Sequence, residues 1–63
     1  MQLLRLSDVC ARVGLKRSSI YRLLDAGGFP RPVELGTRAR GWVPEEIDAW
    51  IQAKIEARDR AAA

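Results

Sequence analysis

The short connection at Gly14 constrains this 63-residue chain more than any other feature, because only Gly14, Leu15 and Lys16 separate two amphipathic helical segments. Apolar residues recur at helical spacing on both sides of it. We expect a first helix over residues 8–13, with Ser7 as its N-cap, and a second helix over residues 17–26. Gly14 can adopt the left-handed conformation that ends a helix, and Leu15 can then pack onto the core.

After the second helix, Gly27 and Gly28 end the periodic pattern, and the prolines that follow prevent its return. Two short β segments, residues 33–35 and 41–43, flank a loop over residues 36–40 that suits a hairpin. Pro44 suits the first turn of a third helix, which we expect to reach about residue 58. The predicted architecture is small, mainly α with some β, in the order helix, turn, helix, β-hairpin, helix. It forms one domain over residues 1–63, with a frayed tail from about residue 59.

The composition leaves little room for catalysis or metal binding. The chain has one cysteine and no histidine, so it can form no intrachain disulfide and lacks the usual zinc ligands and general base. Serines and threonines have no histidine to activate them, and the carboxylates at the start of the third helix are explained by the helix dipole. We therefore expect no catalytic residue, no cofactor and no metal. Trp42, Trp50 and Cys10 are expected in the core, because a domain this small needs large apolar side chains.

No apolar run is long enough to span a membrane, and the N-terminal segment lacks the apolar region of a signal peptide. We therefore expect a cytoplasmic protein without a membrane partner. The charge is unevenly distributed: residues 1–42 hold eight Lys or Arg against three Asp or Glu, giving +5, whereas residues 43–63 hold three against five, giving −2. This asymmetry indicates a polyanionic partner for the first two thirds of the chain.

The start of the second helix carries a cationic and hydroxyl-bearing face. Two helices joined by a short glycine-containing turn form a helix-turn-helix, whose second helix can enter the major groove of DNA. Phosphates would neutralise Lys16 and Arg17, which otherwise stand unfavourably at the positive end of a helix. The candidate DNA-binding residues of this helix are Lys16, Arg17, Ser18, Ser19, Tyr21 and Arg22. Each also has an ordinary structural interpretation: solvated cations, serines that cap the helix, and a tyrosine at the edge of the core.

The hairpin loop adds Thr37, Arg38 and Arg40 as candidate DNA-binding residues. A hairpin directly after a recognition helix can act as a wing that touches flanking backbone or the minor groove, where arginine is favoured. The alternative is that these arginines only keep the loop solvated. Arg31 is a weaker candidate, because it can pair with Glu34 or Asp25.

Over residues 3–55 the sequence resembles the AlpA family of small phage and prophage DNA-binding regulators, which is related to excisionases and MerR-type winged helices. The most specific pieces are "SSIYRLL", "GGFPRPVELG", the "GW" at Gly41-Trp42, and "EIDAWI". The resemblance implies a winged helix-turn-helix that binds double-stranded DNA as a transcriptional regulator, or as an excisionase that directs recombination. It places the contact positions at Arg17, Ser18, Tyr21 and Arg22, and the wing at residues 36–40.

One position departs from the family pattern: Lys16 stands where a Ser or Thr N-cap is usual, at a cost of about 1 kcal/mol. So small a domain can make few base contacts, so we also expect self-association on repeated DNA sites or a partner, namely an integrase or RNA polymerase. No effector domain follows the winged helix, so we expect no small-molecule effector. A protein-binding adaptor that uses the same basic face against an acidic partner is the alternative of another class.

Overall fold

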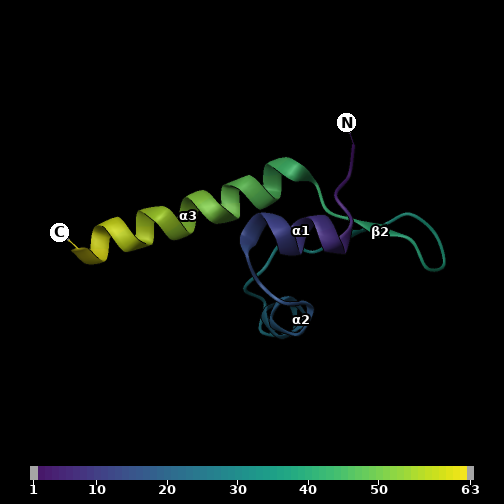
Figure 1. The fold of residues 1–63 in the computed structure, drawn as a ribbon, viewed down its shortest axis with the longest axis horizontal. Helices are drawn as coiled ribbons and strands as arrows, with labels where there is room; N and C mark the ends of the chain where they lie inside the picture. The colour runs from purple at the N-terminus through teal and green to yellow at the C-terminus, as the bar shows by residue number, and fades with distance from the viewer. Residues whose placement is uncertain (1, 63) are drawn as a thin grey trace.

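The computed structural model describes residues 2–62, which form three helices and a two-stranded antiparallel hairpin (Figure 1). The elements are α1 (Leu6–Val13), α2 (Arg17–Asp25), β1 (Val33–Glu34), β2 (Arg40–Gly41) and α3 (Pro44–Ala62). Figure 1 shows α1 at the centre, α2 seen end-on below it, the hairpin on one side and the long α3 projecting on the other. The order and class of the elements are those predicted. No helix within residues 2–62 is long and apolar enough to cross a membrane.

The start of α1 differs from the prediction, because Arg5 and not Ser7 is its N-cap residue. Asp8, three residues further on, accepts a hydrogen bond from the Arg5 backbone N–H at 3.1 Å. A carboxylate at this position satisfies the cap backbone with a charge-assisted bond and also suits the helix dipole. Because the helix starts at Leu6, this apolar side chain packs against the core. The prediction that Ser7 is the N-cap is therefore wrong by two residues.

The two turns around α2 rest on glycines with positive φ. Gly14 ends α1 with φ 73° and ψ 26°, and its N–H bonds the Cys10 carbonyl at 2.8 Å. α2 ends at Asp25, one residue earlier than predicted, and Gly27 follows with φ 77°. The N–H groups of Gly27 and Gly28 bond carbonyls of the last turn of α2, at 3.1 and 2.8 Å. This paired arrangement is a Schellman motif, which ends the helix sharply and sends the chain toward the hairpin.

The hairpin is shifted from the predicted position in its second strand. Val33 pairs with Gly41 and Glu34 with Arg40, so β2 begins at Arg40, which the sequence analysis placed in the loop. Beyond β2, Trp42 forms a bridge with Leu4 on the N-terminal segment, with both N–H···O bonds at 2.8 Å. The N-terminal segment thereby pairs with the chain just after β2, which the sequence analysis did not predict.

Each helix contributes one fully buried side chain to the core: Val9 from α1, Ile20 from α2 and Ile47 from α3. Phe29 and Trp42 complete the buried cluster, so the core joins the helices to the segments on either side of the hairpin. Trp42 is therefore a core residue, as predicted.

Trp50 and Cys10 pack against this cluster but are only half-buried. The Trp50 ring meets Phe29 edge-on with a centroid separation of 4.9 Å, and its indole N–H donates to the Gly28 carbonyl at 2.8 Å. Trp50 thus ties α3 to the turn that follows α2. Trp50 and Cys10 therefore lie at the edge of the core and not in its interior.

The third helix continues to Ala62, beyond the predicted end near residue 58. Its last turns are rich in alanine, arginine and glutamate, which all have high helix propensity. The helix leaves the body of the domain and accounts for its elongated shape, with principal extents of 45 × 25 × 19 Å. Fraying of its end in solution stays a prediction.

Gly41 provides a test of how closely the N-terminal segment packs on the hairpin. A Cβ at position 41 would lie 2.7 Å from the Cβ of Leu3, which is fixed to the backbone and cannot rotate away. We expect Gly41→Ala to lower the free energy of unfolding by about 1–3 kcal/mol through overpacking. Thermal denaturation followed by circular dichroism checks this. Gly36→Ala, where an added Cβ meets nothing within 4 Å, is the matched control; equal losses for the two variants would contradict the packing argument.

Candidate nucleic-acid interface

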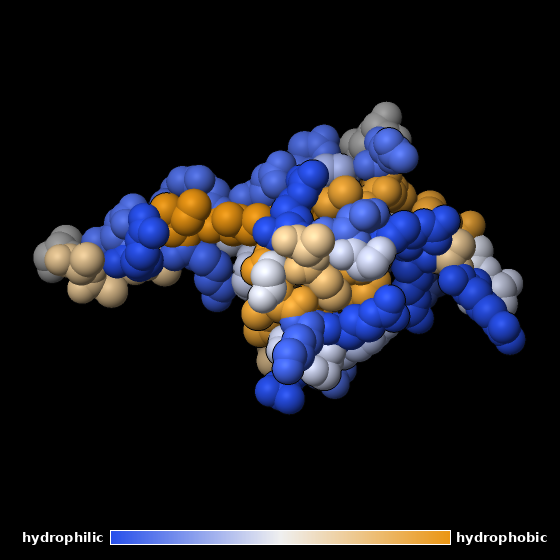
Figure 2. Space-filling view, viewed as in Figure 1, coloured by the Kyte–Doolittle hydropathy of each residue, from blue (hydrophilic) through white to orange (hydrophobic). Residues whose placement is uncertain are grey.

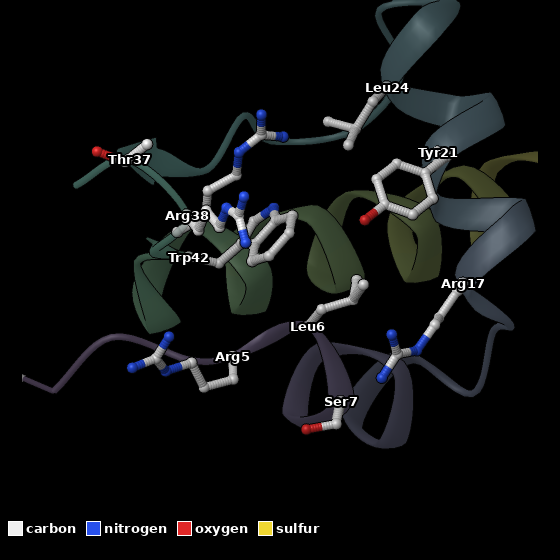
Figure 3. Close-up of a pocket in the computed structure, with 10 residues that line it drawn as sticks. Arg5, Leu6, Ser7, Arg17, Tyr21, Leu24, Thr37, Arg38 and Trp42 are labelled. Atoms are coloured by element: carbon white, nitrogen blue, oxygen red, sulfur yellow. The ribbon is translucent and has the colours of Figure 1, made fainter. Parts of the chain in front are cut away.

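A hollow opens where α1, α2 and the wing (residues 36–40) face one another, and we call it the basic cleft (Figure 3). Its volume is about 560 Å³. The first turn of α1, the outward side of α2 and the wing each contribute polar side chains, and Leu6, Leu24 and Trp42 form its apolar floor. The polar lining residues are Arg5, Ser7, Arg17, Tyr21, Thr37, Arg38 and Arg40.

Four arginines and no acidic residue line this cleft. The salt bridges within residues 2–62 are Arg12–Asp48 and Arg58–Asp59, so none of the four is neutralised by a carboxylate there. Arginine presents planar donors that bind phosphate or carboxylate oxygens in pairs. A concave surface with four such groups concentrates positive potential and is suited to a polyanion.

Five of the nine residues predicted from the sequence meet in the cleft, and they come from two separate elements. Arg17 and Tyr21 lie on α2, and Thr37, Arg38 and Arg40 on the hairpin. Figure 3 shows Arg17 reaching from α2 toward the start of α1, with the Tyr21 hydroxyl pointing into the hollow. Tyr21 is 48% exposed and faces the cleft, so it is not a core-edge residue.

The other four predicted residues lie outside the cleft. Lys16, Ser18 and Arg22 are exposed on α2 or at its start, and Ser19 is half-buried. Lys16 precedes α2, Ser18 and Ser19 lie in its first turn and Arg22 lies in its last turn. The structure therefore separates the sequence-predicted set into a cleft group and an outward group.

Lys16 is the N-cap residue of α2, with extended backbone (φ −79°, ψ 160°) and no side-chain hydrogen bond to cap the helix. The first turn of α2 also contains no acidic residue. Its free N–H groups and its cations thus face solvent together, an arrangement that an isolated helix disfavours and a bound anion would stabilise.

Arg31 lies at a neighbouring hollow of about 290 Å³, which it shares with Asp25 and Glu34. Neither of the salt bridges within residues 2–62 involves Arg31, so the pairing considered from the sequence is not formed. The carboxylates at this second hollow make it a weaker anion site than the basic cleft.

The sequence analysis missed Arg5 and Ser7. Both belong to the start of α1, and they border the cleft because the Leu4–Trp42 bridge holds the N-terminal segment beside the hairpin. Residues this far apart in the chain reveal no local pattern, so periodicity could not have found them. Within the described residues, no group of three or more His, Cys, Asp or Glu could hold a metal ion.

The tight turn between α1 and α2, the hairpin after α2 and the basic cleft between them define a winged helix-turn-helix. Residues 2–55 match the family described as the prophage CP4-57 regulatory protein (AlpA). The chain belongs to this family of DNA-binding regulators, which are not enzymes.

Two relatives give the family relation more detail. The DNA-binding transcriptional activator AlpA of Escherichia coli (strain K12) is 32% identical over 62 residues, which cover 89% of each chain. An uncharacterized protein, ORF88, of Enterobacteria phage P4 is 40% identical over 57 residues, which cover 90% of this chain. That match spans a little under two thirds of the phage protein, 65% of its length.

The uncapped start of α2 generates a stability prediction. We expect Lys16→Ser to raise the free energy of unfolding by about 1 kcal/mol, because a serine hydroxyl can accept a hydrogen bond from a free N–H of the first turn. Lys16→Ala is the matched control, since it removes the charge without adding a cap. Urea denaturation of the free protein measures both. Equal free energies of unfolding for the Ser and Ala variants would show that the absent side-chain cap does not lower the stability of the free protein.

Proposed function

We propose that this protein is a sequence-specific double-stranded DNA-binding regulator that places α2 in the major groove and its wing on the flanking DNA. The observation that supports this most is the basic cleft, where four arginines that form no salt bridge within residues 2–62 converge from the start of α1, α2 and the hairpin. Phosphate contacts position a protein on a duplex, and several converging arginines suit that role.

Exposed side chains of α2 supply the base-reading side of the proposal. In a helix-turn-helix the N-terminal residues of the second helix lie nearest the base edges. Ser18 in the first turn of α2, Tyr21 from the cleft group and Arg22 in the last turn are all exposed on this helix and are our candidates for base contacts. Lys16 and Arg17, at the start of the same helix, are candidates for phosphate contacts.

The wing supplies contacts beyond the reach of α2. Thr37 and Arg38 are exposed in its loop, and Arg40 is exposed at the start of β2. We assign them to flanking phosphates or to the minor groove, whose negative potential favours arginine. Arg5 joins this set from the N-terminal side and extends the phosphate-binding surface along the duplex.

The regulatory outcome is proposed from the family. The E. coli relative is named as a DNA-binding transcriptional activator, and we propose transcriptional regulation of phage or prophage genes in the bacterial cytoplasm, on nucleoid DNA. Action as an excisionase with an integrase is the alternative within the same class. RNA polymerase and further copies of the chain on repeated sites are the other proposed partners, because so small a domain makes few base contacts.

The salt dependence of DNA binding tests the phosphate assignment. A duplex is first obtained by selection from a random library with the full chain, and affinities are measured by fluorescence anisotropy. If the four cleft arginines and Lys16 each neutralise one phosphate, log K falls with log[salt] with a slope of about −4.5. Arg5→Ala should reduce this slope by about one, and Lys16→Ser should weaken binding although it stabilises the free domain. An affinity that does not change between low and moderate salt would refute the proposal.

Base reading and backbone binding are separated by a second pair of variants. We expect Arg22→Ala to cost about 1–3 kcal/mol on the selected site and to relax sequence preference, whereas Arg38→Ala should weaken selected and random DNA more evenly. Arg60→Ala, at the far end of α3, is the control and should change neither. Equal losses on both DNAs for Arg22→Ala would remove it from the base-reading set. No binding to any duplex, with nuclease-resistant capture of an acidic protein, would favour the adaptor alternative.

A further inference from the structure

A hollow of about 290 Å³ adjoins the basic cleft at the end of α2, and we call it the mixed-charge hollow. The two hollows share Tyr21, Leu24 and Arg40 in their linings, so they form one continuous surface. Beyond the shared residues, the mixed-charge hollow presents the carboxylates of Asp25 and Glu34. The basic cleft has no acidic lining residue, so the charge of the surface changes at this boundary.

Hydropathy does not mark this boundary. Figure 2 shows hydrophilic residues gathered over the side of the domain where α2 and the hairpin lie, whereas hydrophobic residues follow α3 where it leaves the body. The hydrophilic surface on the α2 and hairpin side includes the exposed residues of the mixed-charge hollow as well as those of the basic cleft. The limit for a polyanion there is therefore set by the sign of the charge.

The charges in the two linings differ sharply. Four arginines and no carboxylate give the basic cleft a formal lining charge of +4. In the mixed-charge hollow, Arg31 and Arg40 are matched by two carboxylates, which gives a formal lining charge of 0. Phosphate binding needs uncompensated cations, so the attraction for a DNA backbone ends where Asp25 and Glu34 begin.

Both carboxylates are available to act on a ligand. Asp25 and Glu34 are exposed, and neither takes part in the salt bridges formed within residues 2–62. Glu34 lies directly opposite Arg40 in the hairpin register, so the two side chains project from the same face of the hairpin. Arg40 thus stands between a carboxylate on its own hairpin and the cations of the basic cleft.

The position of Asp25 is unfavourable for the free helix. It is the last residue of α2, where the helix dipole disfavours a negative charge. Arg17, the first residue, is likewise charged against the dipole, although Arg22 in the last turn favours it. A bound duplex accounts for both ends of α2 when phosphate lies at the first residue and is kept away from the last.

We propose that Asp25 and Glu34 are specificity-determining residues that end the phosphate-binding surface and hold the DNA backbone in one register. This inference rests on the proposed function and adds a repulsive element to it. Non-specific binding depends on phosphate contacts and tolerates many registers, and the carboxylates penalise those that carry phosphates into the mixed-charge hollow. A selected site loses less, because its base contacts form only in the register that keeps phosphates in the basic cleft.

Neutral isosteres of the two carboxylates test the proposal. Affinities of Asp25→Asn and Glu34→Gln for the selected duplex and for a random duplex of equal length are measured by fluorescence anisotropy at low salt. We expect each variant to bind random DNA about threefold more tightly, as one unit charge near a phosphate contact in water predicts, and to gain less on the selected duplex. Glu56→Gln, exposed on α3 and in the lining of neither hollow, is the matched control and should leave the ratio of the two affinities unchanged.

Arg31 provides an independent readout of the boundary. In the unmodified protein the carboxylates cancel its charge, so Arg31→Ala should change the affinity for random DNA by less than about twofold. In the double variant Asp25→Asn, Glu34→Gln, Arg31 is an uncompensated cation on the extended surface. Arg31→Ala should there weaken random-DNA binding about threefold and reduce the salt slope by about one. A merely structural role of the two carboxylates would not produce this coupling.

The other outcomes overturn the proposal. Equal gains on selected and random DNA would show that the carboxylates only lower the overall positive charge. Weaker binding of the selected duplex by Glu34→Gln would show that this carboxylate contacts a base, such as the amino group of cytosine. The same loss of selectivity in Glu56→Gln would show a long-range effect of charge. If the unmodified protein binds no duplex, the proposed function fails as well, whereas unchanged selectivity with intact binding overturns only this inference.

Discussion

The structure depends most on Trp42, the residue at which the N-terminal segment, the hairpin and the core meet. Its backbone pairs in both directions with Leu4, and its indole N–H donates to the Pro30 carbonyl at 2.9 Å. The ring is 3% exposed and also forms part of the floor of the basic cleft. Through its backbone and its indole together, Trp42 therefore fixes the positions of Arg5 and the wing relative to α2. In a domain with so small a core, the geometry of the cleft and the stability of the fold are set by the same contacts.

The start of α2 shows how this fold balances stability against its proposed ligand. A helix N-terminus without a cap or an acidic residue leaves donors unsatisfied, and cations beside it raise the cost. Lys16 and Arg17 impose that cost on the free protein. The fold tolerates it because Ile20 of the same helix is fully buried and the Schellman motif at Gly27 and Gly28 secures the other end. The unfavourable electrostatics are confined to the turn that the proposal brings against phosphate, and a bound phosphate would offset them.

Local patterns in the sequence predicted the elements, because helical periodicity, glycine turns and prolines act over a few residues. They identified the break at Gly14 and the start of α3 at Pro44, and the outward face of α2 followed from its apolar stripe. Three features escaped prediction: a non-local contact bears on two of them, and in the third a local capping pair three residues apart overrode the propensity of Ser7. With Trp42 paired to Leu4, β2 begins at Arg40, one residue earlier than predicted. The same bridge brings Arg5 beside the wing. The reach of Asp8 back to Arg5 displaced the cap from Ser7, which a propensity argument favours.

The small number of DNA contacts that one copy can make bears on how so small a domain can be selective. The basic cleft offers a handful of cations, and phosphate contacts carry no sequence information of their own. On the proposed function, base reading rests on a few side chains of α2, which limits the discrimination that one copy can achieve. A partner protein or a further copy bound beside this domain, as proposed above, would act as a second binding module, because its contact to neighbouring DNA then becomes intramolecular and gains a high effective concentration. Selectivity would then arise from the combination of the two contacts.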